Sequence, residues 1–304
     1  MRAGANSPHN CSIIPSLGWA GEIDYSTIKS ISKFKYRGDR MRSNLGVGIT
    51  LSMFGLVMVI KAIFLFHQDQ NVLVSLVLDS MMYVLLALLI FIERKNLASF
   101  RVDRFSLITL MLTSFIRMRY KILGEFYVLL VIGVAGLVIG YVLISQWHNI
   151  PKTNKNSAIV GLLLGIGLGI PIAIGEVVSH SLPIYGDKAL SLSLPAILLN
   201  RTVYALNYAS TTEEFLFRGF LWGYFLKIGW TEQKAGFIQG LIFWLSHFEK
   251  IVFPLSFFLG LPLFIFTISK LRYHFQQVFP SLVAHTMINA ITGTVTFIFI
   301  ERSS

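Results

Sequence analysis

The sequence predicts an all-α protein, a polytopic transmembrane bundle of about eight spans. Two observations lead to this fold class. The chain of 304 residues is 54% hydrophobic and only 13% charged, whereas an ordinary soluble domain has about a quarter charged residues. Apolar runs also recur along the whole chain, and many approach the roughly 20 residues that a helix needs to cross a bilayer.

The N-terminal residues 1–44 are predicted to form a basic cytoplasmic tail. Seven Lys or Arg lie in this tail and seven more in residues 93–121, together 14 of the 26 in the chain, while the connection at 67–71 (HQDQN) has none. Basic residues mark the cytoplasmic side of a membrane protein, so the tail and the 93–121 loop are both expected there. The net charge of +11 is therefore explained by basic residues that set the orientation of the chain in the membrane. The bilayer is the expected partner, and nucleic acid is not.

Apolar segments along the rest of the chain give the candidate spans, of which about eight are expected to cross the membrane. Segment 190–228 is compatible with one long or broken helix instead of two. The segments are 45–66, 71–92, 122–144, 158–178, 190–210, 214–228, 235–249, 251–268 and 279–300.

Two further segments have their own signals. The stretch 105–116 (FSLITLMLTSFI) is too short to span and lies between basic clusters, which favours an interfacial or re-entrant helix. The run GLLLGIGLGI at 161–170 predicts a helix with a small-residue face for close packing. Residues 45–150 are thus expected to form N-terminal membrane helices with the basic loop, and residues 155–300 a separate helical core.

Three short motifs in the last third of the chain carry the chemistry. They are EEFLFRG at 213–219, FWLSH at 243–247 and HTMIN at 285–289, each inside an apolar stretch. Ionisable side chains at membrane depth are costly, which makes them candidates for a functional site. Each motif pairs two notable residues four positions apart, and such residues share one face of a helix.

The adjacent carboxylates of the first motif are expected to have different roles. Neighbouring helical residues point in directions about 100° apart, so Glu213 and Glu214 cannot do the same work. Glu214 can pair with Arg218 one turn later. Glu213 has no local partner, and an unpaired carboxylate in an apolar setting suits a general base or acid. The alternative is that both carboxylates form ordinary helix-stabilising ion pairs.

The second and third motifs add two imidazoles and an amide. His285 and Asn289 face the same way and could stabilise an oxyanion, as preorganised donors do in acyl transfer. The alternatives are that His247 is an ordinary interfacial histidine and that the His285–Asn289 pair ties two helices together.

The order and spacing of these motifs resemble those of the CAAX protease and bacteriocin-processing family of intramembrane metalloproteases. Its best-known member is the type II CAAX prenyl endopeptidase. The resemblance covers roughly residues 190–298, about a third of the chain. Every position of the family pattern is occupied: Glu213, Glu214, Arg218, Phe243, His247, His285 and Asn289.

The resemblance implies a helical bundle with a buried polar active-site cavity open to the cytoplasm. It further implies that the chain is an endopeptidase acting on membrane-associated peptides or proteins. In that case Glu213 and His247 activate the hydrolytic water, and His285 and Asn289 stabilise the tetrahedral oxyanion.

Supporting roles fall to Glu214 and Arg218, which would hold the first motif helix in place, and to Phe243. Prenylated proteins would be the substrates in a eukaryotic host. In a bacterium the resemblance points to peptide processing or bacteriocin self-immunity. Compact loops and the absence of a targeting signal favour a bacterial cell membrane.

A metal ion is one of two open possibilities for the cofactor. Glu213, His247 and His285 could supply three ligands to Zn²⁺ and leave a position for water. The same side chains could act without metal, by general-base catalysis. No H-E-x-x-H motif occurs, and Cys11 is the only cysteine, so neither a zincin helix nor a cysteine-based zinc site is present.

Two other classes of function stay open. One is a non-catalytic membrane immunity or scaffold protein whose polar cluster binds a peptide partner. The other is a secondary transporter, because buried ionisable residues also line transport paths. No inverted repeat is visible, and the ionisable residues crowd into the last third of the chain, which argues against transport.

Overall fold

The computed structural model describes residues 45–66, 72–119, 126–179, 193–252 and 254–301, and all the regular elements in these ranges are helical. The predicted tail 1–44 and connection 67–71 lie outside the described residues. The first half contains α2 (Leu45–Phe66), α3 (Val72–Ile92), η1 (Leu97–Phe100), α4 (Arg104–Arg119), α5 (Phe126–Ser145) and α6 (Lys155–Ser179). The second half contains α7 (Leu194–Ala205), η2 (Leu206–Ser210), α8 (Thr211–Glu213), η3 (Glu214–Leu221), α9 (Trp222–Lys227), α10 (Glu232–Leu245), η4 (Phe248–Val252), η5 (Ser256–Gly260), α11 (Leu261–Phe275), α12 (Phe279–Thr296) and η6 (Phe297–Glu301).

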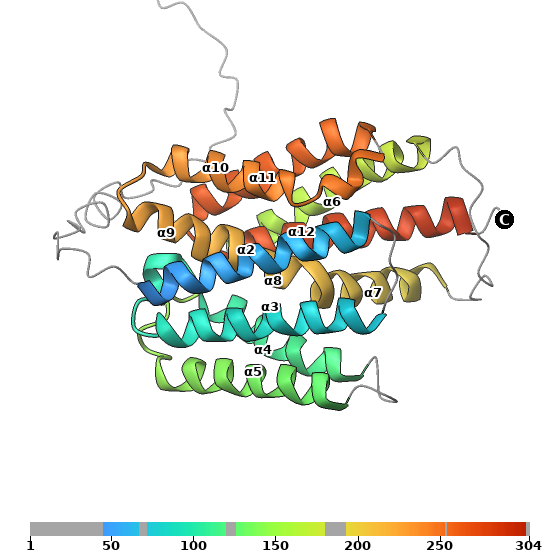
Figure 1. Ribbon diagram of the computed structural model, residues 1–304. Helices are drawn as coiled ribbons and strands as arrows, with labels where there is room; N and C mark the ends of the chain where they lie inside the picture. Colours follow the sequence, from blue (N-terminus) through green and yellow to red (C-terminus); the bar gives the residue numbers. More distant parts are fainter. Residues whose placement is uncertain (1–44, 67–71, 120–125, 180–192, 253, 302–304) are drawn as a thin grey trace, which may run out of the picture. The chain divides into compact units, whose positions relative to one another are not determined.

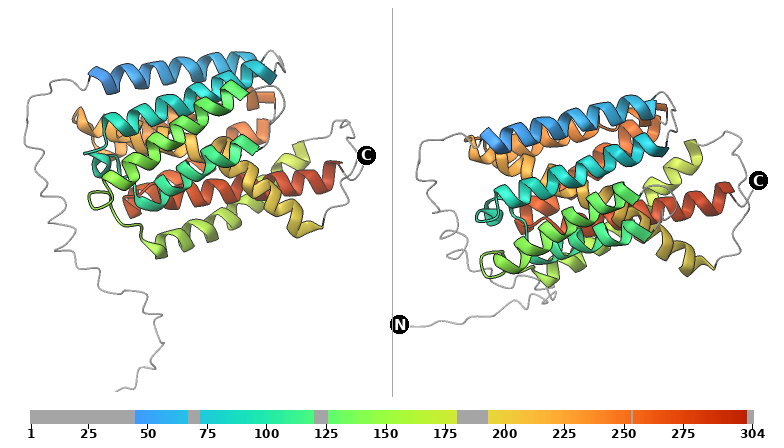
Figure 2. Two further views of the ribbon diagram at one scale, coloured as in Figure 1. Left: turned by 90° about the horizontal axis from the view of Figure 1, so that it is seen from below. Right: turned by 60° about the horizontal axis from the view of Figure 1, so that its bottom comes forward.

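The N-terminal helices pack side by side. Helix α3 lies between α2 and α5 (Figure 1; Figure 2), and α4 pairs with α5. Their shared core is apolar and includes Tyr83, Phe100 and Ile139, none of which is exposed. These apolar contacts make the N-terminal helices one packed layer.

Within the basic region 93–121, the helix expected at 105–116 is present as α4. Helix α4 has 16 residues, and its Leu107, Leu110 and Thr113 side chains are fully buried. Most of this region is therefore packed against other helices. Its position relative to the bilayer stays a prediction.

Asp103 joins the beginnings of two helices that are far apart in sequence. Its Oδ1 accepts hydrogen bonds from the Ser106 amide at 3.1 Å and from the Thr153 hydroxyl at 2.6 Å. Its Oδ2 accepts from the Phe279 amide at 3.0 Å. Because the first amides of a helix have no intrahelical partner, one carboxylate caps both α4 and α12.

Glycines allow α6 and α12 to pack closely, which confirms the predicted small-residue face. A Cβ atom added to Gly165 would lie 2.8 Å from the Ala284 carbonyl oxygen, and Gly161 and Gly169 are equally crowded by α12. Gly167 differs from this prediction, because it faces open space. Larger residues at the three crowded positions would push α12 away.

Residues 194–227 form one continuous helix, the first of the two possibilities for this region. The backbone stays right-handed helical through α7, η2, α8, η3 and α9. Two parts of it, η2 and η3, have the wider π-helical turn. Such turns are rare and occur often at functional sites. The first motif begins where α8 changes into η3.

Apolar surface supports a membrane setting. Two described helices, at Lys155–Val178 and Phe279–Phe299, are long and apolar enough to cross a bilayer, and four shorter apolar helices accompany them. Large apolar side chains point outward, such as Ile144, which is 80% exposed. Soluble monomers rarely expose so much apolar surface. The expected number of eight spans is not established by these helices.

Candidate active site

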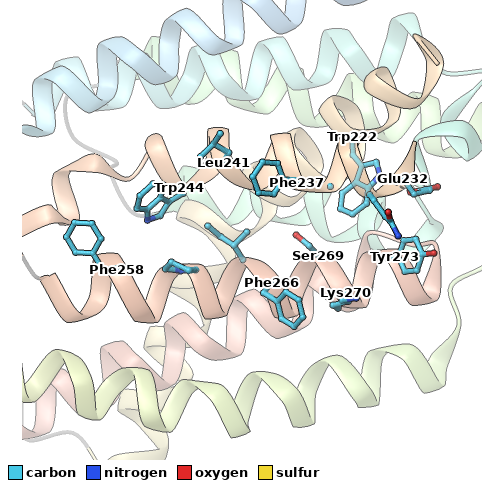
Figure 3. A pocket seen from close by; sticks show the side chains of 15 residues that line it. Trp222, Glu232, Phe237, Leu241, Trp244, Phe258, Phe266, Ser269, Lys270 and Tyr273 are labelled. Carbon is cyan, nitrogen blue, oxygen red and sulfur yellow. Dashed lines mark hydrogen bonds between the residues drawn. The ribbon is translucent and has the colours of Figure 1, made fainter. Parts of the chain in front are cut away.

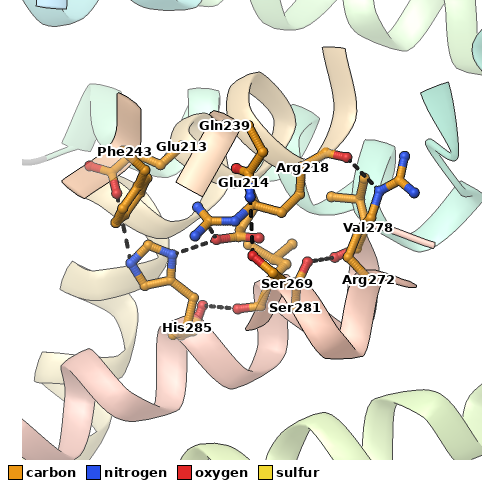
Figure 4. Close-up of polar contacts among 12 residues, drawn as sticks. Glu213, Glu214, Arg218, Gln239, Phe243, Ser269, Arg272, Val278, Ser281 and His285 are labelled. Carbon is orange, nitrogen blue, oxygen red and sulfur yellow. Dashed lines mark hydrogen bonds and ion pairs between the residues drawn. The ribbon is translucent and has the colours of Figure 1, made fainter. Parts of the chain in front are cut away.

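The three motifs meet at one point, although they are distant in sequence (Figure 4). Glu213 ends α8, His247 follows the end of α10, and His285 lies in the first half of α12. The Nε2 atom of His247 is 3.9 Å from Glu213 Oε2, and the Nε2 atom of His285 is 3.8 Å from the same oxygen. The structure therefore brings one carboxylate oxygen and two imidazole nitrogens together.

Glu214 points away from Glu213, as adjacent helical residues must. Its Oε1 lies 3.2 Å from Arg218 Nη1 and 2.8 Å from His285 Nδ1, and both Glu214 and Arg218 are fully buried. The pairing with Arg218 agrees with the sequence analysis. The contact with His285 was not expected, and through it Glu214 orients the imidazole ring of His285.

Hydrogen bonds determine the proton positions on both histidines. His247 Nδ1 lies 2.9 Å from the Phe243 carbonyl oxygen, which can only accept. His285 Nδ1 faces the ion-paired carboxylate of Glu214, which also accepts. Each Nδ1 therefore carries a proton, and each Nε2 faces Glu213.

Three atoms that can accept a hydrogen bond or bind a cation face the meeting point: Glu213 Oε2 and the Nε2 atoms of His247 and His285. Glu213 Oε2 is buried and has no hydrogen-bond partner among the described residues. A buried polar atom without a partner is costly. A water molecule has two hydrogens and can donate to two of these atoms, whereas a cation can bind all three.

Aromatic rings enclose this cluster. Phe243 is fully buried, with its ring centroid 4.4 Å from that of His247 and 4.2 Å from the Arg218 guanidinium carbon. Phe264 packs edge-on against His285 at 4.6 Å. Sequence reasoning missed Phe264, because a phenylalanine in an apolar helix gives no signal of its own.

Asn289 lies one helical turn beyond His285 on α12 and is half-buried. Its amide makes no hydrogen bond to another described residue, so its two N–H donors are available to a ligand.

A second buried arginine supports the motif helix from behind. Arg272 on α11 is fully buried and donates from Nε to the Arg218 carbonyl oxygen at 2.9 Å. Nearby, the buried Gln239 amide donates to Ser269 Oγ at 3.0 Å. The sequence did contain a signal for Arg272, a charged residue close to an apolar stretch, but no spacing rule linked it to the motifs.

The residues present fit a metal ion by their chemistry. No group of three or more His, Cys, Asp or Glu side chains in the described part of the chain is already arranged around a metal position. Nevertheless Glu213, His247 and His285 offer one carboxylate oxygen and two imidazole lone pairs. Separations of 3.8–3.9 Å leave room for one atom that is bonded to both partners at about 2.0–2.2 Å.

Comparison with known proteins finds one family model that matches part of the chain. Residues 195–291 match the model described as type II CAAX prenyl endopeptidase Rce1-like. No curated protein and no solved structure matches the chain. The matched segment includes every motif position from Glu213 to Asn289. The Rce1-like family is membrane-embedded and is generally a protease family. Through residues 195–291, the chain is therefore similar to the Rce1-like type II CAAX prenyl endopeptidases.

Proposed function

We propose that this chain is an intramembrane endopeptidase that hydrolyses peptide bonds of membrane-associated peptides or proteins. One observation carries the proposal. The Nε2 atoms of His247 and His285 lie 3.9 and 3.8 Å from one unpartnered oxygen of Glu213. A water molecule at this point can donate one proton to Glu213 and the other to an imidazole nitrogen, and transfer of the first proton is the requirement for hydrolysis.

In the proposed mechanism Glu213 is the general base. It takes a proton from the bound water as the water oxygen forms a bond to the scissile carbonyl carbon. The same proton then passes to the leaving amide nitrogen as the C–N bond breaks, giving a carboxylic acid and an amine. The lone pair of His247 holds the second water proton and so orients the attacking oxygen.

The oxyanion is assigned mainly to Asn289. His285, expected to be a second oxyanion donor, has Nδ1 2.8 Å from Glu214 Oε1 and Nε2 3.8 Å from Glu213 Oε2, and its donor role stays a proposal. The free amide of Asn289, one turn further along α12, supplies the donor for the developing negative charge.

If the enzyme uses Zn²⁺, the same Glu213, His247 and His285 would hold it. The ion would act as a Lewis acid toward the carbonyl and make the bound water more acidic. Glu214 would then have the role of a carboxylate that orients a ligand histidine. Because the hydrogen bonds place a proton on each Nδ1, each Nε2 can face either a water molecule or a metal ion. The same arrangement is therefore compatible with the metal-free and the metal-dependent mechanism.

The remaining features extend the proposal. We propose about eight spans, with a polar cavity open to the cytoplasm, in a bacterial cell membrane. The substrates would be peptides processed at the membrane surface or bacteriocins neutralised for self-immunity. A non-catalytic immunity or scaffold protein is the alternative, and the test below separates it from an enzyme.

The test is cleavage of a membrane-delivered peptide by purified protein in detergent. Glu213→Gln keeps the side-chain shape but removes the base, and we expect a loss of about 10²–10⁴ in rate without a change in thermal unfolding. Glu176→Gln on α6, outside the cluster, is the matched control and should stay active. Full activity of Glu213→Gln would exclude the protease and favour the peptide binder.

A second arm decides the cofactor. The wild-type enzyme is assayed after treatment with a chelator and again after addition of Zn²⁺. Loss of activity followed by recovery assigns the metal to the site. Unchanged activity assigns the metal-free mechanism.

A further inference from the structure

A groove runs between α10 and α11, and none of its lining residues belongs to the catalytic cluster (Figure 3). Its volume is about 770 Å³. Most of its length is apolar and aromatic, with Phe237, Leu241, Trp244 and Phe258 along the walls. Such a surface suits a flexible hydrocarbon better than a hydrated ligand.

The groove has the length of one lipid chain. On α10 it extends from Glu232 to Trp244, which is about 18 Å at 1.5 Å per residue. The hydrocarbon core of a bilayer is about 30 Å thick, so a chain in one leaflet covers about 15 Å. One acyl chain would therefore fill the groove from end to end.

One end of the groove is positively charged. Its carboxylate, Glu232, is already paired with both Arg101 and Arg272. Lys270 also lines this end, and its only described partner is the ring of Phe266, 5.4 Å from Nζ. The charge that remains after pairing is positive, and it complements an anion.

This charged end lies at the predicted cytoplasmic side. Arg101, which pairs with Glu232, belongs to the basic region 93–121. Lys227, at the end of α9, pairs with Glu93 of the same region at 2.9 Å. Tyr273 and Trp222 also lie at this end of the groove, as aromatic residues do at a membrane–water interface.

We propose that the groove binds one acyl chain of an anionic phospholipid of the cytoplasmic leaflet, with the lipid phosphate next to Lys270. The length of the groove, its apolar lining and the positive charge at one end all match such a lipid. Because Lys270 belongs to no part of the catalytic cluster, the proposal does not depend on the proposed enzyme activity. The groove nevertheless shares the Gln239–Ser269 hydrogen bond with the site, since Ser269 lines the groove.

The experiment uses Trp244 as the reporter. The full-length protein is reconstituted in phosphatidylcholine vesicles that contain a small fraction of either phosphatidylglycerol or phosphatidylcholine with brominated acyl chains. Bromine quenches tryptophan fluorescence at contact. The difference between the wild-type protein and Trp244→Phe isolates the signal of the groove. We expect a preference of about fivefold for brominated phosphatidylglycerol, as one lysine near a membrane surface gives.

Two charge-reversal variants complete the test. Lys270→Glu should abolish the preference, whereas Lys152→Glu, an exposed lysine outside the groove, should leave it unchanged. Equal quenching by both lipids in the wild type would overturn the proposal and indicate ordinary surrounding lipid. An unchanged preference in Lys270→Glu would also overturn it. Absence of quenching would assign the groove to a protein partner instead.

Discussion

The N-terminal helices α2–α5 and the C-terminal helices α7–α12 bury polar side chains in different ways. In α4, Thr113 and Ser114 donate to carbonyl oxygens three residues earlier in their own helix. In the C-terminal region Glu214 contacts His285 on another helix, and Arg272 on α11 donates to the backbone of η3. These α4 hydroxyls are thus satisfied within their own helix, whereas the buried charges of the C-terminal region depend on partners from other helices.

This difference shows where a functional site can be maintained. A hydroxyl that donates to a carbonyl oxygen of its own helix needs no partner on a neighbouring helix. Buried charges, in contrast, remain stable only while all their partners are present, because an uncompensated charge is costly. The family match follows the same division, since it covers residues 195–291 and leaves out α2–α5.

The largest effect is expected from Arg218→Ala. It leaves the Glu214 carboxylate buried beside His285 without its cation, and loss of one partner of a buried pair costs about 3–5 kcal/mol. Both folded yield and cleavage should fall. Thermal unfolding in detergent, together with the cleavage assay, measures this. A variant with wild-type stability would show that the C-terminal polar groups are less interdependent than described here.

Asn289→Ala should affect the rate alone. Loss of one oxyanion donor costs about 10²–10³ in kcat. The side chain is half-buried and has no hydrogen bond to a described residue, so the unfolding temperature should change little. Steady-state kinetics on the purified variant give kcat and KM separately. A loss confined to KM would assign Asn289 to substrate binding instead.

Gly136→Ala should affect stability alone, because it lies in the N-terminal region. A Cβ atom there would clash with Ser114 Oγ and would separate α4 from α5. Overpacking of this kind costs about 1–3 kcal/mol. Gly55→Ala is the control, since a Cβ on Gly55 meets nothing within 4 Å. Chemical denaturation of both variants checks the prediction, and equal stability of the two would contradict it.

The smallest effect is expected from Thr113→Val. This change removes a hydroxyl that bonds to the Leu110 carbonyl at 2.9 Å and receives the Tyr83 hydroxyl at 3.3 Å. Tyr83 keeps a second acceptor in the Asn207 carbonyl oxygen. We expect a loss of about 0.5–1.5 kcal/mol at most. A larger loss, measured by chemical denaturation, would mean that the Tyr83–Thr113 hydrogen bond between α3 and α4 contributes more to stability than expected.

The limits of the helices could be predicted because hydrophobicity decides them. The expected segment 71–92 corresponds to Val72–Ile92, and 279–300 to α12 with η6, since each apolar run stops at polar residues. The π-helical turns of η2 and η3 could not be predicted. They depend on which neighbouring side chains crowd the backbone, and a single sequence does not contain that information.

The site was predictable only in part, for a similar reason. Local spacing was sufficient to separate the directions of Glu213 and Glu214 and to pair Glu214 with Arg218. The contact between Glu214 and His285 joins residues 71 positions apart, and the packing of α12 decides it. Without that contact the Nδ1 proton of His285 could not be placed.

The position of Asp103 limits how far the chain can be shortened around residues 195–291. The family match begins at residue 195, but the α12 helix that carries His285 starts from an amide held by a carboxylate 176 positions earlier. A fragment that begins at residue 195 would lack this anchor, and the first amide of α12 would lose its partner. The unit that keeps α12 capped as described is therefore larger than the segment that sequence comparison recognises.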